Sequence, residues 1–153
     1  MNDQGISCPG NEVLMAFTDE EKNAVYAVEK ACFADCWTPE MLSEELDNPL
    51  CVTVALTENG AVMGYALGRV AADEAELFRI GVMPDSRGRG AGMRLLMQLH
   101  ELMKTRGAAV CFLEVRSLNA PARALYRKAG YEEIAVRRGY YGDDDAVIMK
   151  AVL

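Results

Sequence analysis

The fold is decided by the stretch Arg87-Gly88-Arg89-Gly90-Ala91-Gly92, because this stretch joins two segments of different periodicity. It follows an apolar, strand-like run that ends at Val82, and it leads into a helix-like run that begins near Met93. Glycines let a ligand approach the backbone closely, and the first amides of a helix have no partner within that helix. A loop of this composition at a helix start is typical of a phosphate-binding site.

The charge of this loop supports the same interpretation. Residues 87–94 contain three arginines and no acid, although the 153-residue chain carries a formal net charge of -7. The alternative is a flexible turn whose arginines are solvated. Two nucleotide motifs are excluded: no Lys-Ser or Lys-Thr follows Gly92, as a P-loop requires, and Met93 and Leu95 stand where a dinucleotide fingerprint needs a third glycine.

Length and composition predict one domain over residues 1–153, with residues 1–11 as a loose N-terminal tail. The acidic balance argues against nucleic-acid binding. Five cysteines and one histidine show no metal-ligand spacing, so we expect no metal and a reduced, cytoplasmic location. We also expect no secretory signal and no membrane span.

Hydrophobic periodicity and turn residues predict an α/β (α+β) fold. Thr18 and Glu21 form a capping box, and Glu58-Asn59-Gly60 marks a hairpin turn. Helices are expected from Thr18 to Cys32, from Thr38 to Asp47, from Ala91 to Arg106 and from Asn119 to Ala129. Strands are expected at Glu12–Phe17, Cys51–Thr57, Ala61–Val70, Ala75–Met83, Val110–Val115, Tyr131–Arg138 and Ala146–Val152.

The pattern Arg-x-x-Gly-x-Gly after the strand Ile80-Gly81-Val82-Met83-Pro84 resembles the acetyl-coenzyme A loop of GNAT-type N-acetyltransferases. Within that superfamily the chain is most similar to the RimI branch, which modifies the terminal alanine of a small-subunit ribosomal protein. The resemblance covers roughly Thr18 to the C-terminus. It rests further on the segments Phe112-Leu113-Glu114-Val115-Arg116-Ser117-Leu118-Asn119, Ala124-Leu125-Tyr126, Ala129-Gly130-Tyr131 and Arg137-Arg138-Gly139-Tyr140-Tyr141.

The resemblance implies the GNAT fold, with a mixed, mostly antiparallel sheet of about seven strands, flanking helices and two splayed central parallel strands. It also implies acetyl-coenzyme A (acetyl-CoA) as cosubstrate, with the pantetheine arm between the strands that end near Val82 and Glu114. Asn119 on its own suggests a helix cap, and the resemblance implies a second role for it, a contact to the pantetheine or its amides. The implied coenzyme contacts are Ile80, Gly81, Val82, Arg87, Gly88, Arg89, Gly90, Ala91, Gly92, Met93 and Asn119.

Two residues are candidates for proton transfer. Glu114 is the only charge in an otherwise apolar strand, where burial can raise the proton affinity of a carboxylate. The alternative is a strand-end glutamate that reaches water. The resemblance implies that Glu114 is the proton acceptor and that Tyr126 is the proton donor, whereas Tyr126 on its own would suggest a core tyrosine. We expect His100 to be structural or solvated.

Chemistry favours an α-amine as acceptor, because its pKa of about 7.8 leaves far more neutral amine at pH 7 than the roughly 10.4 of lysine. The resemblance implies that the acceptor, the N-terminus of a ribosomal protein, enters between the loop around Trp37 and the hairpin that carries Tyr140 and Tyr141. Acetylation of lysine or of a small amine such as a polyamine or aminoglycoside, and a non-catalytic acetyl-CoA sensor or partner module, remain alternatives. We interpret the acidic turn at residues 142–145 as solvated rather than as an attractor for basic peptides.

Overall fold

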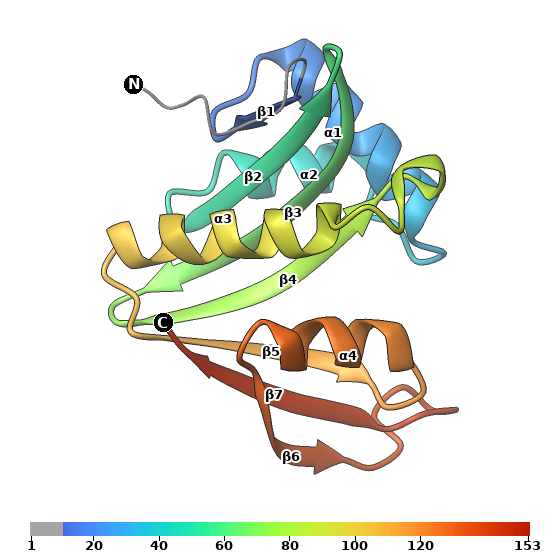
Figure 1. The fold of residues 1–153 in the computed structure, drawn as a ribbon, viewed down its shortest axis with the longest axis vertical. Helices are drawn as coiled ribbons and strands as arrows, with labels where there is room; N and C mark the ends of the chain where they lie inside the picture. Colours follow the sequence, from blue (N-terminus) through green and yellow to red (C-terminus); the bar gives the residue numbers. More distant parts are fainter. Residues whose placement is uncertain (1–10) are drawn as a thin grey trace.

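The computed structural model describes residues 11–153, which form a seven-stranded mixed sheet with helices on both faces (Figure 1). The strand order is β1-β2-β3-β4-β5-β7-β6, and every neighbouring pair is antiparallel except β4 and β5. The strands are β1 (Asn11–Leu14), β2 (Cys51–Glu58), β3 (Ala61–Ala71), β4 (Glu74–Val82), β5 (Val110–Arg116), β6 (Glu132–Arg137) and β7 (Ala146–Val152). The predicted number of strands and their order along the chain are confirmed.

Four helices cover the sheet in two layers. Helices α1 (Asp19–Cys32) and α2 (Pro39–Leu46) lie on one face, and α3 (Ala91–Thr105) and α4 (Ala120–Lys128) lie on the other (Figure 1). Each layer has its own buried cluster. One unites α1 and α2 with β2 and β3, and the larger one unites α3 and α4 with the opposite face of β2, β3, β4, β5 and β7. Within the described residues, no helix is long and apolar enough to cross a membrane.

The central strands β4 and β5 are paired over a short distance. Only three residue pairs are in register, from Glu74 opposite Val110 to Glu76 opposite Phe112. Beyond them β4 continues to Val82 and β5 continues to Arg116, and the two strands diverge (Figure 1). The predicted splay of the parallel strands is therefore confirmed, and it leaves a wedge between β4 and β5 inside the sheet.

The first strand and the first helix differ in how well the sequence predicted them. The capping box of α1 is present, since Thr18 Oγ1 accepts from the Glu21 amide at 3.1 Å and Glu21 Oε1 accepts from the Thr18 amide at 2.9 Å. The strand expected at Glu12–Phe17 instead begins at Asn11 and ends at Leu14, because the chain must turn before the cap and Phe17 packs against the α1–α2 cluster. The expected loose tail lies outside the described residues, apart from Asn11.

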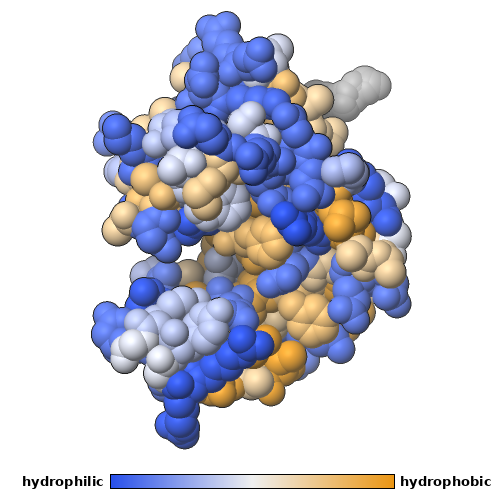
Figure 2. All heavy atoms as spheres, turned by 180° about the vertical axis from the view of Figure 1, so that it is seen from behind, coloured by the Kyte–Doolittle hydropathy of each residue, from blue (hydrophilic) through white to orange (hydrophobic). Residues whose placement is uncertain are grey.

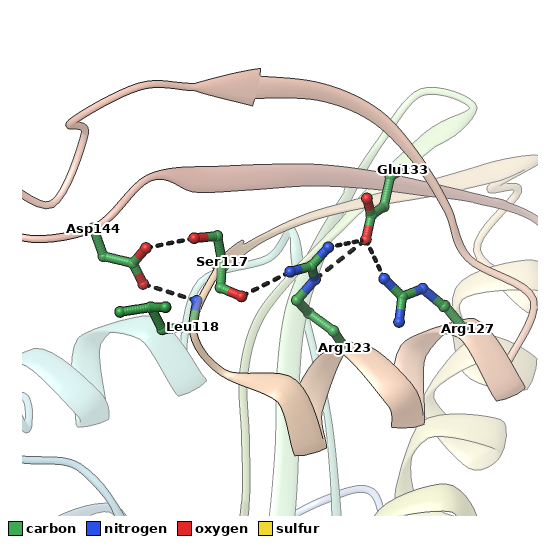
Figure 3. Close-up of polar contacts among 6 residues, drawn as sticks. All are labelled: Ser117, Leu118, Arg123, Arg127, Glu133 and Asp144. Atoms are coloured by element: carbon green, nitrogen blue, oxygen red, sulfur yellow. Dashed lines mark hydrogen bonds and ion pairs between the residues drawn. The ribbon is translucent and has the colours of Figure 1, made fainter.

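The acidic turn between β6 and β7 is anchored, which corrects the expectation that it is solvated. The buried carboxylate of Asp144 accepts hydrogen bonds from the Ser117 hydroxyl at 2.5 Å and from the Leu118 amide at 3.0 Å (Figure 3). These bonds hold the pKa of Asp144 below its usual range. Asp143 contacts Arg116 at 3.0 Å, and Asp145 accepts from the Gly139 amide at 2.7 Å.

Helix α4 is tied to the edge strand β6 by a second group of ion pairs. The guanidinium groups of Arg123 and Arg127 each approach Glu133 Oε2 at 2.6 Å, and Arg123 also donates to the Ser117 carbonyl at 2.7 Å (Figure 3). The arginine hydrogen bonds lower the pKa of Glu133. Together with the bonds of Asp144, these contacts fix the C-terminal hairpin against β5 and α4.

Candidate functional site

The wedge exposes backbone groups of β4. The Met83 amide donates to the Met63 carbonyl of β3 at 2.8 Å. Because backbone groups of successive strand residues point to opposite edges, those of Val82 and Ile80 point into the wedge. The Val82 carbonyl accepts from Arg87 Nε at 2.8 Å and from the Cys32 thiol at 3.3 Å. Two of the three predicted contacts on β4 therefore face the wedge.

Gly81, the third predicted contact, has a packing role. By the same alternation its backbone groups point to β3 rather than into the wedge. A Cβ atom at this position would lie 3.2 Å from Cys32 Sγ and 3.3 Å from a ring carbon of Phe33. Glycine therefore allows the end of α1 to lie directly on β4. The irregularity of the β3–β4 pair lies away from Gly81, opposite Leu67 and Gly68.

The glycine-rich loop leaves the start of α3 open. Gly90 is the N-cap residue, with φ +82°, and no side chain caps the helix. A Cβ atom on Gly88 or Gly90 would meet nothing within 4 Å, whereas one on Gly92 would touch Leu125 at 3.4 Å. The amides of Ala91, Gly92 and Met93 head the helix, so the loop has both the space and the donors that an anion needs.

The loop arginines point in different directions. Arg87 is exposed and turns toward the end of β4, where its Nη2 lies 3.6 Å from Cys32 Sγ in addition to its bond to Val82. Arg89 turns toward the β2–β3 hairpin and forms an exposed ion pair with Glu58 at 3.4 Å. Such an exposed pair is weak, so Arg89 can leave it for a stronger anion.

Glu114 lies on the α1–α2 side of β5, because its neighbours Leu113 and Val115 are buried in the cluster on the other side. Its side chain is 28% exposed, and its Oε1 lies 3.5 Å from Arg137 Nη1. The negative charge of Glu114 contributes, after burial, to the raised pKa values of Glu76 and Tyr141. Glu114 is thus half-buried in a group of charged and aromatic side chains.

Tyr126 approaches β5 from the opposite face. It is buried in the α3–α4 cluster, and its ring meets that of Tyr131 edge-on at 5.8 Å. Burial raises the pKa of Tyr126 to about 12. A ligand could contact both Glu114 and Tyr126 only where the sheet is open, which is the wedge between β4 and β5.

Asn119 caps a helix, which is one of the two roles expected for it. Its Oδ1 accepts from the Ala122 amide at 3.2 Å and so begins α4. His100 is the structural residue expected, because it is buried and its Nε2 lies 2.7 Å from the Tyr131 hydroxyl.

The three aromatic residues predicted for the acceptor come from two elements. Tyr140 and Tyr141 meet edge-on at 5.1 Å, with Arg137 over the first ring and Arg116 over the second. Trp37, on the α1–α2 loop, packs against the same cluster as Leu42. Figure 2 shows a hollow between the part of the surface that carries the helices and the part that carries the hairpin.

Sequence reasoning missed a buried ionic group beside Trp37. Glu29 is fully buried, its Oε1 accepts from the Tyr65 hydroxyl, and its Oε2 lies 3.3 Å from Arg79 Nη2. A signal was present, because Glu29 shares the helical spacing of Val25, Val28 and Cys32 on the apolar side of α1.

Residues 22–131 match the Acetyltransferase (GNAT) family. The chain belongs to this family. Its members are acetyl-CoA-dependent acetyltransferases, so the resemblance predicted from the sequence is confirmed.

Relatives in this GNAT family include the [ribosomal protein bS18]-alanine N-acetyltransferase of Escherichia coli K12, which is 38% identical over 82% of this chain and 87% of the relative. The N-alpha-acetyltransferase RimI of Mycobacterium tuberculosis is 41% identical over 70% of this chain and 68% of the relative. The crystal structure of the ribosomal-protein-S18-alanine N-acetyltransferase from Escherichia coli superimposes with a TM-score of 0.84, at 34% identity and 93% coverage of both chains.

Proposed function

We propose that this GNAT protein transfers an acetyl group from acetyl-CoA to the N-terminal α-amine of a ribosomal protein that begins with alanine. The observation that carries the proposal is the wedge, where the free edge of β4 meets a carboxylate on one face and a tyrosine on the other. The names of the E. coli and M. tuberculosis relatives supply the acceptor class.

The described residues fit acetyl-CoA. The open amides at the start of α3 suit its diphosphate, and the backbone of Ile80 and Val82 suits its pantetheine amides. When bound, acetyl-CoA supplies a thioester and a thiolate leaving group. Arg87 already holds the Val82 carbonyl, so it must shift when the edge of β4 is used in full.

Glu114 is the proposed proton acceptor. The α-amine must lose a proton to become a nucleophile, and a carboxylate in a half-buried strand position can take that proton directly or through water. The Arg137 guanidinium occupies the position near Glu114 where a cationic amine would arrive. Arg137 also lies over the ring of Tyr140. We therefore assign the hairpin residues Tyr140 and Tyr141, together with Trp37, to the passage of the acceptor.

Tyr126 is the proposed proton donor to the departing sulfur. Its pKa of about 12 lies roughly 3.5 units above the 8.5 of an ordinary thiol, so full transfer to a thiolate is uphill by about 5 kcal/mol. A hydrogen bond that strengthens as charge develops on sulfur is the role that this proton affinity allows. Tyr126 is 8% exposed, and its hydroxyl is not among the fully buried unpaired polar atoms of the described residues, so a ligand can reach it.

The remaining assignments follow from the acceptor. A ribosomal protein places the reaction in the cytoplasm, where the free Cys32, Cys36, Cys51 and Cys111 stay reduced. We propose that one catalytic domain carries the whole reaction, since coenzyme loop, base and acceptor wall all belong to one sheet.

Glu114→Gln tests the proposal. The amide cannot accept the proton, so kcat for an alanine-initiated peptide should fall by roughly two or more orders of magnitude while acetyl-CoA affinity changes little. Thiol release measures the rate, and isothermal titration measures the affinity. Glu76→Gln is the matched control, because Glu76 is a nearby carboxylate on the same sheet face; its kcat should stay within about threefold of the parent.

The peptide panel decides the acceptor. Peptides that begin with alanine, their pre-acetylated forms, internal lysines and polyamines should be compared, with the product located by mass spectrometry. Modification of lysine or polyamine alone would replace the proposed acceptor. Equal rates for the Glu114→Gln variant and the parent would end the assignment of the base, and binding without turnover would favour a sensor module.

A further inference from the structure

Arg79 joins β4 to the loop between α1 and α2. Its side chain is 13% exposed and leaves β4 on the face that α1 and α2 cover. Its guanidinium lies over the ring of Phe33, at 4.3 Å from the centroid, and over that of Trp37, at 5.0 Å. A planar guanidinium stacks on aromatic faces in this way, which a lysine ammonium does not.

The polar contacts of Arg79 reach the same loop. Its Nη2 donates to the Asp35 carbonyl at 3.1 Å, and its Nη1 lies 3.6 Å from Asp35 Oδ1. The loop residues Phe33, Asp35 and Trp37 are thus all held by one side chain that is rooted in the central sheet.

Glu29 completes the arrangement from the end of α1. Its fully buried carboxylate faces Arg79 Nη2 at 3.3 Å and accepts from the Trp37 amide at 2.9 Å. The Tyr65 hydroxyl of β3 donates to its other oxygen. The Trp37 main chain and ring are therefore fixed by the two members of one buried ion pair, and removal of the arginine would leave an uncompensated charge.

We propose that Arg79 is a positioning residue that sets the α1–α2 loop, and with it Trp37, relative to the edge of β4. The acceptor side of this inference rests on the proposed function. Arg79 is one residue away from Ile80, whose backbone faces the wedge, so a single strand segment fixes the coenzyme edge and the acceptor wall together. We expect acceptor recognition, and not coenzyme binding, to depend on this side chain.

Arg79→Lys is the test, because lysine keeps the charge near Glu29 but loses the stacking and the forked hydrogen bonds. Arg69→Lys is the matched control: Arg69 also pairs with a glutamate, Glu45, and stacks on Phe78, but it joins β3 to α2 rather than to the loop. Hydrogen exchange of the Trp37 amide should speed up about tenfold in Arg79→Lys, and the acceptor KM should rise about tenfold. The acetyl-CoA dissociation constant should stay within about twofold, and Arg69→Lys should show neither change.

If Arg79→Lys folds poorly, the double variant Glu29→Gln/Arg79→Met is the second test. It removes both buried charges and should loosen the α1–α2 loop in the same way. Parent-like exchange at Trp37 in both Arg79 variants would overturn the inference. So would an acetyl-CoA dissociation constant that rises in step with the acceptor KM. The exchange measurement needs no turnover, so it is independent of whether the proposed acetylation is observed.

Discussion

At the scale of single residues, Tyr126 can be a packing residue of the core or a hydrogen-bond donor to a ligand. The surroundings of its hydroxyl bear on this choice. Burial alone raises its pKa to about 12, and within residues 11–153 its hydroxyl has no hydrogen-bond partner. The hydroxyl is not among the fully buried unpaired polar atoms of these residues, so it reaches the surface although the ring is buried. The hydroxyl is therefore available to a ligand in the wedge.

Tyr126→Phe removes that hydroxyl and leaves the packing. We expect kcat to fall at least about tenfold with acetyl-CoA affinity and thermal unfolding nearly unchanged. Because the tyrosine of the parent stays protonated below its pKa of about 12, its kcat should show no loss attributable to this group up to pH 10. A decline centred well below pH 10 that disappears in the variant would contradict the assigned protonation state.

The roles of some residues could be predicted from the sequence and those of others could not. The difference lies in how far along the chain the contacts of each residue are. Glu114 could be singled out as a candidate because a charge within an apolar strand is a local signal. The partners of Arg79, by contrast, lie more than 40 residues earlier, so its role is visible only in the folded chain. Asp144 was misjudged for the same reason, since the Ser117 hydroxyl that it binds lies 27 residues before it.

At the scale of elements, the start of α3 combines a positive backbone angle with open space. Gly90 has φ +82°, and nothing lies within 4 Å of the position of a Cβ atom.

Glycines and capping residues predicted where most helices begin and end, because such signals act within a few residues. The predicted end of β1 was wrong, because the end of this strand depends on its register with β2 and on the packing of Phe17.

Gly90→Ala tests whether the loop binds a diphosphate. Alanine in the left-handed region costs about 1–2 kcal/mol, and any shift of the loop would move the amides that face the ligand. Gly60→Ala is the matched control, with φ +84° and equally open space but a position in the β2–β3 turn. Both variants should lose similar stability in urea, whereas only Gly90→Ala should weaken acetyl-CoA binding, by about tenfold or more. Equal coenzyme affinity in the two variants would place the diphosphate elsewhere.

At the scale of the whole molecule, His100 connects α3 to the C-terminal half of the sheet through Tyr131. Burial lowers the pKa of His100 to about 4, against roughly 6.5 in an unfolded chain. Between these values the unfolded state binds the extra proton, so the folded state loses stability as the pH falls from 6.5 to 4. Above pH 6.5 the contribution of the histidine is fully present.

His100→Gln should remove part of this pH dependence. The parent should lose about 2 kcal/mol from this residue between pH 7.5 and pH 5, measured as free energy of unfolding in urea, and the variant should lose correspondingly less. Working above pH 5 keeps the result apart from Asp144 and Glu133, whose lowered pKa values matter only at more acidic pH. Parallel stability curves for parent and variant would show that another group is responsible.

The short pairing of β4 and β5 also bears on self-association. An unpaired strand edge usually lies at the rim of a sheet, where it invites other chains to add strands and is guarded by charges or prolines. The free edge of β4 belongs to the apolar residues Ile80 and Val82, and one charged side chain, that of Arg87, bonds the Val82 carbonyl there. This edge faces β5 inside the sheet rather than lying at the rim, so it is not placed for rim-to-rim pairing with another chain. The divergence of β4 and β5 thus frees backbone groups within the sheet without adding an outer edge at which chains could pair.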